Sequence, residues 1–121
     1  MKLIIAGSRN ITDEVILFKA LKKFNIKSNN VSEVVCGMAK GADALGFNYG
    51  SCFSITIKEF KPDWNKFGKS AGHRRNRDMG DYGDVLLALW DGESRGTKGM
   101  IEYMKSLGKP TYVYNIKEEN E

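Results

Sequence analysis

The chain has 121 residues, of which 41% are hydrophobic and 28% are charged, and its formal net charge at pH 7 is +4. This length is typical of one compact domain and excludes a two-domain enzyme. No apolar run approaches the roughly 18–20 residues of a membrane-spanning helix, and the apolar N-terminal segment is too short for a signal peptide. We therefore expect a soluble cytoplasmic domain with no membrane partner.

The two cysteines, Cys36 and Cys52, lack the spacing of a zinc site or of a disulfide framework. We expect both to be reduced and buried, and we predict neither a metal nor a cofactor. A nucleophilic Cys36 is the alternative, because this residue ends a predicted strand. The mild positive charge fits nucleic acid, an anionic small ligand or solubility alone.

Short continuous apolar runs alternate with longer helical periods along the chain, which is typical of βα units around a parallel sheet. Unbroken runs indicate central strands, whereas the alternating third run indicates an edge strand. The predicted strands are 2–6, 33–36, 53–58, 84–90 and 111–116.

Apolar residues at helical spacing predict helices around residues 17–24 and 100–107. Thr12 or Asp13 can cap the start of the first helix, and Gly108 ends the last one. Each helix therefore has one apolar face that can pack against the sheet.

These elements predict a single α/β domain over residues 1–117, followed by a charged tail at 118–121 that we expect to be frayed. With right-handed crossovers, the fold is doubly wound and Rossmann-like, a five-stranded parallel sheet of order 3-2-1-4-5 with helices on both faces. Ligands bind such sheets at the carboxyl ends of the strands, where the strand order reverses. The loops after strands one, two and four should therefore form the site.

Those three loops are rich in glycine and in groups that bind anions. Glycines let the backbone approach a ligand closely, and the helix that follows presents its positive end to a phosphate. Asp43 either caps the second of these helices or holds a ribose hydroxyl. None of the loops contains the dinucleotide-binding or the Walker pattern, which excludes dehydrogenases and kinases.

The segment 61–79 is basic and poor in core residues. One interpretation is a solvated, charged helix face. The other is that the helix starts over the crevice and directs a guanidinium and Asn76 at a phosphate, because arginine gives planar, bidentate recognition. Trp64 or Trp90 could then stack on a base, although both are more typical of core positions, and His73 is expected to have a surface role.

Taken in order, the motifs of the chain resemble the YspA-like branch of the SLOG superfamily. The resemblance covers nearly the whole chain, and its motifs are specific only as an ordered set. The set consists of Gly7-Ser8-Arg9 with Asp13, the stretch 35–43, Asp63-Trp64, the stretch 68–72 with Arg75-Asn76 and Met79, and Trp90 with the stretch 94–97.

The resemblance implies a Rossmann-like fold that binds nucleotides or nucleotide-derived signals. SLOG proteins also include the DNA-processing DprA proteins and the LOG phosphoribohydrolases. The ligand-binding residues that we assign are Gly7, Ser8, Arg9, Gly37, Lys40, Gly41, Asp43, Arg75, Asn76, Ser94, Gly96 and Thr97.

The resemblance to LOG enzymes fails at their catalytic carboxylate. Their motif P-G-G-x-G-T-x-x-E places a glutamate three residues after the threonine, and here that position is Met100. Glu102 comes two residues later, which is about 200° further around the helix, so it cannot simply replace that glutamate. We therefore assign no catalytic residue.

The leading hypothesis is a sensor or sequestering protein for a phosphate-bearing nucleotide or nucleotide derivative, acting in signalling or in a host–virus conflict. The enzyme alternative is hydrolysis of the N-glycosidic bond of a nucleoside monophosphate, using Glu102, Asp43 or Asp91. DNA binding in the manner of DprA needs a larger basic surface than this charge indicates. A homo-oligomer is also expected, because the arginine-rich helix and the half-exposed third strand need partners or solvent.

Overall fold

The computed structural model describes residues 1–37 and 40–119. Its strands are β1 (Lys2–Gly7), β2 (Glu33–Gly37), β3 (Thr56–Phe60), β4 (Val85–Trp90) and β5 (Thr111–Asn115). Its α-helices are α1 (Glu14–Lys23), α2 (Ala42–Cys52), α3 (Trp64–Phe67), α4 (Ala71–Tyr82), α5 (Arg95–Ser106) and α6 (Ile116–Glu119), and short 3-10 helices span Ser28–Asn30 and Gly68–Ser70.

The five strands form one parallel sheet of order β3-β2-β1-β4-β5, which confirms the predicted doubly wound fold. The central strand β1 pairs with β2 and β4, so the strand order reverses between β1 and β4. Among the described residues, no helix is both long and apolar enough to cross a membrane.

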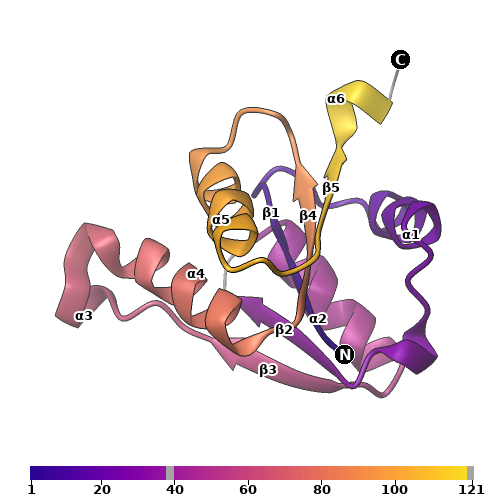
Figure 1. The fold of residues 1–121 in the computed structure, drawn as a ribbon, viewed down its shortest axis with the longest axis horizontal. Coiled ribbons are helices and arrows are strands. Elements are labelled where there is room, and N and C mark those ends of the chain that lie inside the picture. The colour runs from indigo at the N-terminus through magenta and orange to yellow at the C-terminus, as the bar shows by residue number, and fades with distance from the viewer. Residues whose placement is uncertain (38–39, 120–121) are drawn as a thin grey trace.

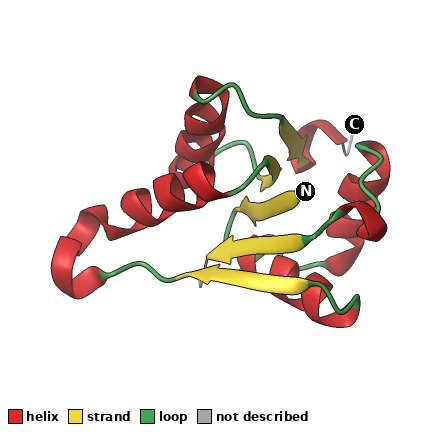
Figure 2. Ribbon diagram, turned by 60° about the horizontal axis from the view of Figure 1, so that its bottom comes forward, coloured by secondary structure: helices red, strands yellow, loops and turns green. Residues whose placement is uncertain are grey.

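Helices cover both faces of this sheet (Figures 1 and 2). Side chains alternate along a strand, so Leu3 and Ile5 of β1 join one core cluster, and Ile4 and Ala6 join the other. The first cluster contains buried residues of α1 and α2, and the second contains those of α4 and α5. The loops after β1 and β4 are thereby fixed between two packed layers.

Two local predictions differ from the structure. The third strand begins at Thr56 rather than at residue 53, because α2 continues to Cys52 and the Phe53 ring packs against Tyr49, 5.0 Å between ring centroids. Residues 118 and 119 of the expected tail belong to α6, where Glu119 forms an ion pair with Lys23 of α1.

The helix α4 is held at its C-terminal end by a lysine from a distant part of the chain. Lys109 Nζ donates hydrogen bonds to the carbonyl oxygens of Gly80, Asp81 and Gly83, at 2.7, 3.0 and 2.8 Å. Ala71 and Met79 are buried apolar side chains of α4. The helix is therefore fixed at both ends, although its middle carries mostly polar residues.

Candidate functional site

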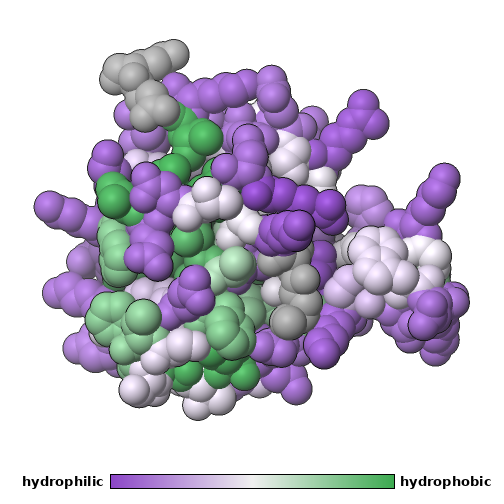
Figure 3. Space-filling model, turned by 180° about the vertical axis from the view of Figure 1, so that it is seen from behind, coloured by the Kyte–Doolittle hydropathy of each residue, from purple (hydrophilic) through white to green (hydrophobic). Residues whose placement is uncertain are grey.

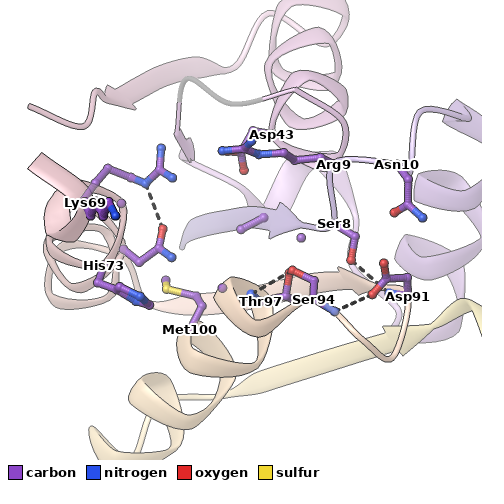
Figure 4. Close-up of a pocket in the computed structure, with 16 residues that line it drawn as sticks. Ser8, Arg9, Asn10, Asp43, Lys69, His73, Asp91, Ser94, Thr97 and Met100 are labelled. Atoms are coloured by element: carbon purple, nitrogen blue, oxygen red, sulfur yellow. Dashed lines mark hydrogen bonds between the residues drawn. The ribbon is translucent and has the colours of Figure 1, made fainter. Parts of the chain in front are cut away.

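A pocket of about 490 Å³ opens at the carboxyl ends of the strands, where the strand order reverses. Figure 4 shows its lining, which comes from the loop after β1, the start of α2, the start of α4, and the loop and helix after β4. The lining residues are Ala6, Gly7, Ser8, Arg9, Asn10, Asp43, Lys69, Gly72, His73, Arg75, Asn76, Asp91, Ser94, Gly96, Thr97 and Met100.

One wall of the pocket is the hydrogen-bonded start of α5. Ser94 Oγ accepts from the backbone N–H of Thr97 at 3.4 Å and from its hydroxyl at 3.0 Å, which caps the helix. The Asp91 carboxylate accepts from the N–H groups of Ser94 and Glu93, both at 2.8 Å, and these bonds lower its pKa. Ser8 Oγ accepts from Asp91 N–H at 3.0 Å and ties this loop to β1.

Gly96 keeps this wall open toward the pocket. A Cβ built on Gly96 would meet no other atom within 4 Å, apart from those of its own helix turn. The backbone at the start of α5 is therefore accessible to a ligand, and it lies at the positive end of the helix dipole.

The opposite wall is the start of α4 with the 3-10 helix before it, and it carries Arg75 and Lys69, two of the cations in the lining. Arg75 Nε donates to Asn76 Oδ1 at 2.9 Å, and both residues line the pocket together with Lys69 and His73. Arg75 Nη1 is fully buried and has no hydrogen-bond acceptor among the described residues. Burial lowers the pKa of Arg75, and the Asp43 carboxylate opposes that shift.

Two predicted glycines lie behind the pocket wall rather than in it. A Cβ on Gly37 would lie 2.4 Å from Arg75 Nη1, so this glycine makes room for the guanidinium. Gly41 has a φ of +76°, and a Cβ there would lie 2.4 Å from the carbonyl oxygen of Arg9. Both glycines thus support the residues that line the pocket.

Nine of the assigned ligand-binding residues line the pocket, and Gly37, Gly41 and Lys40 do not. Lys40 is exposed and lies outside the lining. Residues 38 and 39 of the second predicted loop lie outside the described residues.

The structure adds residues that the assignment omitted. Asn10 directly follows the assigned loop after β1, and Lys69, His73 and Asn76 follow one another at intervals of four and three residues, which is about one helical turn each. The spacing to Asn76 was the available signal, because α4 has few apolar residues with which to define its inner face. Asp91 was recognisable as the polar residue directly after a buried strand.

The two tryptophans, which could have stacked on a base, lie outside the pocket lining. Trp64 is 53% exposed, and Trp90 Nε1 donates to the carbonyl oxygen of Ser94 at 3.0 Å.

The two cysteines differ in burial. Cys36 is buried, and burial, with the charges of Asp43 and Glu59, raises its pKa to about 12, which makes it a poor nucleophile. Cys52 is exposed, contrary to prediction, because it lies on a side of α2 that faces away from the sheet.

The fold and the pocket together define a Rossmann-like α/β domain whose pocket lies at the reversal of strand order, the usual place of a ligand site in this architecture. Residues 1–67 match the model of the YspA, cpYpsA-related SLOG family. The Gene 61 protein of Mycobacterium phage D29 is 31% identical over 122 residues, which cover 96% of this chain and 98% of that protein. The chain belongs to this SLOG family. No solved structure gave a significant match.

Proposed function

We propose that the protein binds a phosphate-bearing nucleotide or nucleotide derivative in this pocket and acts as a sensor or sequestering protein. The observation that carries the proposal is Arg75 Nη1, a buried cationic donor without an acceptor among the described residues. A charged donor left unsatisfied in the interior costs more than the roughly 1–3 kcal/mol of a neutral one. Arg75 also lines the pocket, so a turn of its side chain would bring this donor to a phosphate oxygen there, which would supply the missing acceptor.

The start of α5 supports the same ligand class from the other wall. Its backbone is open at Gly96, and the hydroxyl groups of Ser94 and Thr97 stand beside it. Backbone N–H groups and a helix dipole favour a bound anion. The pocket thus offers a phosphate both a guanidinium and a helix terminus.

The charges in the lining favour an anionic ligand. Arg9, Lys69 and Arg75 contribute three cations against the carboxylates of Asp43 and Asp91. Asp91 already accepts backbone hydrogen bonds within its own loop. The cations therefore exceed the carboxylates, and the Asp91 carboxylate is already solvated in part by the N–H groups of its own loop.

Titration calorimetry with ribose 5-phosphate and with nucleoside monophosphates tests the proposal. Gly96→Val should fold, because a Cβ there meets open space, and should lose binding, because its side chain enters the pocket. Lys98→Val is the matched control on the exposed side of the same helix. Unchanged binding in Gly96→Val would exclude the loop after β4 from the site.

Native mass spectrometry of the protein as purified from cells would identify a retained ligand and the oligomeric state together.

We also propose that the protein forms a homo-oligomer. Apolar side chains exposed on α1 and at the end of α2 support this, because Phe18 and Phe53 are each 48% exposed. From behind, the molecule shows a green apolar area on its main body, while the projection at the right is largely purple and white (Figure 3). A phage-encoded relative supports a role in host–virus conflict.

Hydrolysis of an N-glycosidic bond is the second candidate, because the carboxylates of Asp43 and Asp91 both line the pocket. The residue at the position of the LOG glutamate, Met100, also lines it, and Glu102 lines a neighbouring hollow instead. Release of free base from nucleoside monophosphates distinguishes this enzyme from a binding protein.

A further inference from the structure

The pocket contains little that could hold a nucleobase. Among the described residues that line it, the imidazole of His73 is the one ring, and most of the side chains are polar or charged. Bases bind by stacking on flat or apolar groups, and the two guanidinium groups of this lining, Arg9 and Arg75, serve the phosphate in the proposed function. A nucleotide seated here needs a second surface for its base.

A second hollow of about 350 Å³ lies beside the pocket, between α4 and α5. The two hollows share His73, Asn76 and Met100 as lining residues. The two hollows therefore adjoin each other at these three side chains, so a ligand that reaches past them would enter the second hollow. The residues that line only the second hollow are Arg77, Gly99, Glu102 and Tyr103.

We propose that the hollow between α4 and α5 binds the nucleobase of the ligand, and that its polar groups select guanine. This proposal rests on the proposed function, because it places the base relative to a phosphate held in the pocket.

The shape of α5 supports a path for the ligand from one hollow to the other. Gly96 lines the pocket and Gly99 lines the second hollow, and residues three apart lie on the same side of a helix. A Cβ built on either glycine would meet no other atom within 4 Å, apart from those of its own helix turn. The helix therefore leaves its surface open at one glycine beside each hollow.

The second hollow also has the groups on which a base can stack. Met100 contributes a thioether, and the guanidinium of Arg77 lies over the Tyr103 ring at 5.9 Å from its centroid. The Tyr103 hydroxyl donates to Asp81 Oδ1 at 2.5 Å, which fixes the ring. Aromatic and guanidinium groups are the usual partners of stacked bases.

Hydrogen bonding in this hollow matches the Watson–Crick edge of guanine. The Glu102 carboxylate accepts only, and its two oxygens suit the adjacent N1–H and N2–H donors of guanine. Asn76 Oδ1 already accepts from Arg75, which leaves its amide nitrogen as a donor, and Arg77 is a second donor; either suits guanine O6. Adenine and cytosine lack two adjacent donors on this edge.

The test compares ribose 5-phosphate, GMP and AMP by calorimetry in the wild type and in Gly99→Leu. GMP should bind at least about tenfold more tightly than ribose 5-phosphate, because stacking and hydrogen bonds of the base add to phosphate binding. Gly99→Leu fills the hollow, so it should remove this difference and leave the affinity for ribose 5-phosphate within about twofold. Lys98→Leu, on the exposed side of the same helix, should keep the difference.

Selectivity is tested separately with Glu102→Gln. This change should weaken GMP binding by about tenfold and AMP binding by much less, because an amide offers guanine one acceptor instead of two. Equal losses for both nucleotides would overturn the assignment of guanine. GMP binding no tighter than ribose 5-phosphate in the wild type, or an equal loss of both ligands in Gly99→Leu, would overturn the base site while the phosphate site stands. If the wild type binds none of the three ligands, the proposed function and the base site both fail.

Discussion

The guanidinium of Arg75 occupies the space that a side chain at Gly37 would fill. A Cβ on Gly37 would lie 2.4 Å from Arg75 Nη1 and 3.0 Å from Asp43 Oδ2. The glycine at the end of β2 therefore leaves the space into which the Arg75 guanidinium and the Asp43 carboxylate both extend. Residues of β2, α2 and α4 come together in this way beside the pocket.

Gly37→Ala should displace the guanidinium while leaving the fold intact. The nearest atoms belong to the ends of the Arg75 and Asp43 side chains, which can move at a lower cost than backbone. We expect the affinity for ribose 5-phosphate to fall by about tenfold, the loss of roughly one charge-assisted hydrogen bond. Calorimetry measures the affinity, and thermal unfolding verifies the fold. Unchanged affinity would mean that the buried position of Arg75 does not matter for binding.

Arg75→Ala should weaken binding far more than Arg74→Ala. Hydrogen bonds to a charged group contribute about 1.5–3 kcal/mol, which is tenfold to more than a hundredfold in affinity, whereas an exposed charge contributes under about 1 kcal/mol. Arg74 is the better control, because it lies over the Phe67 ring at 4.3 Å and lines neither hollow, whereas Arg77 lines the second hollow. Equal losses in both variants would indicate diffuse electrostatic attraction instead of a specific contact.

Lys109→Met should destabilise the domain by about 1.5–3 kcal/mol. Lys109 Nζ donates to three carbonyl oxygens at the end of α4, where a cation also interacts favourably with the helix dipole. Methionine keeps the length of the side chain but leaves those carbonyl groups without their donor. Urea unfolding measures the change, and Lys105→Met is the control on an exposed lysine of α5. Equal unfolding midpoints in the two variants would contradict a structural role for Lys109.

The strand order and most strand bounds could be predicted from the sequence because they depend on local apolar runs. The unbroken run of β4 indicates burial on both faces, and the structure buries Val85 through Leu89. The start of β3 could not be predicted, because Phe53 has the character of a strand residue but packs on Tyr49 at the end of α2. Here a contact within the helix layer overrides the strand propensity.

The site was predictable where its residues follow strands and unpredictable where it depends on contacts across the fold. Ser8, Ser94 and Thr97 follow the strands that flank the reversal, so topology alone brings them together. Lys109 joins residues 26 to 29 positions away, and no local pattern indicates such a contact. His73 lines the pocket although it is exposed, which the polar sequence of α4 could not distinguish from a purely solvated side chain.

The two thiols should react at very different rates in the native protein. Cys36 is 0% exposed, and its pKa is raised to about 12, chiefly by burial, so its thiol stays protonated at pH 8. Cys52 is exposed and should react with Ellman's reagent at once. In the Cys52→Ser variant, Cys36 is the thiol that remains, and its reaction with the reagent should require unfolding in urea. Rapid labelling of native Cys52→Ser would show that β2 opens readily.

The purified protein should not release base from nucleoside monophosphates at an enzymatic rate. Cleavage of an N-glycosidic bond develops positive charge on the sugar, and a carboxylate beside it stabilises that charge and can deprotonate water. General-base catalysis alone increases the reaction rate by a factor of about 10²–10⁴. At the position that the LOG resemblance assigns to this carboxylate, the pocket presents the thioether of Met100, which does neither.

Two of the other carboxylates, Glu102 and Asp91, are poorly suited to this role. Glu102 lines the second hollow and not the pocket, and the pKa of Asp91 is lowered by the N–H groups of Ser94 and Glu93, which makes it a weaker base. Chromatography of GMP and AMP after incubation with the protein measures the free base. Release that disappears in Asp43→Asn or Asp91→Asn would place a catalytic carboxylate in the pocket, and release that disappears in Glu102→Gln would place it in the second hollow. Either result would mean that the protein is a hydrolase and not a sensor. We expect that the wild type and all three variants bind the nucleotides without releasing the base.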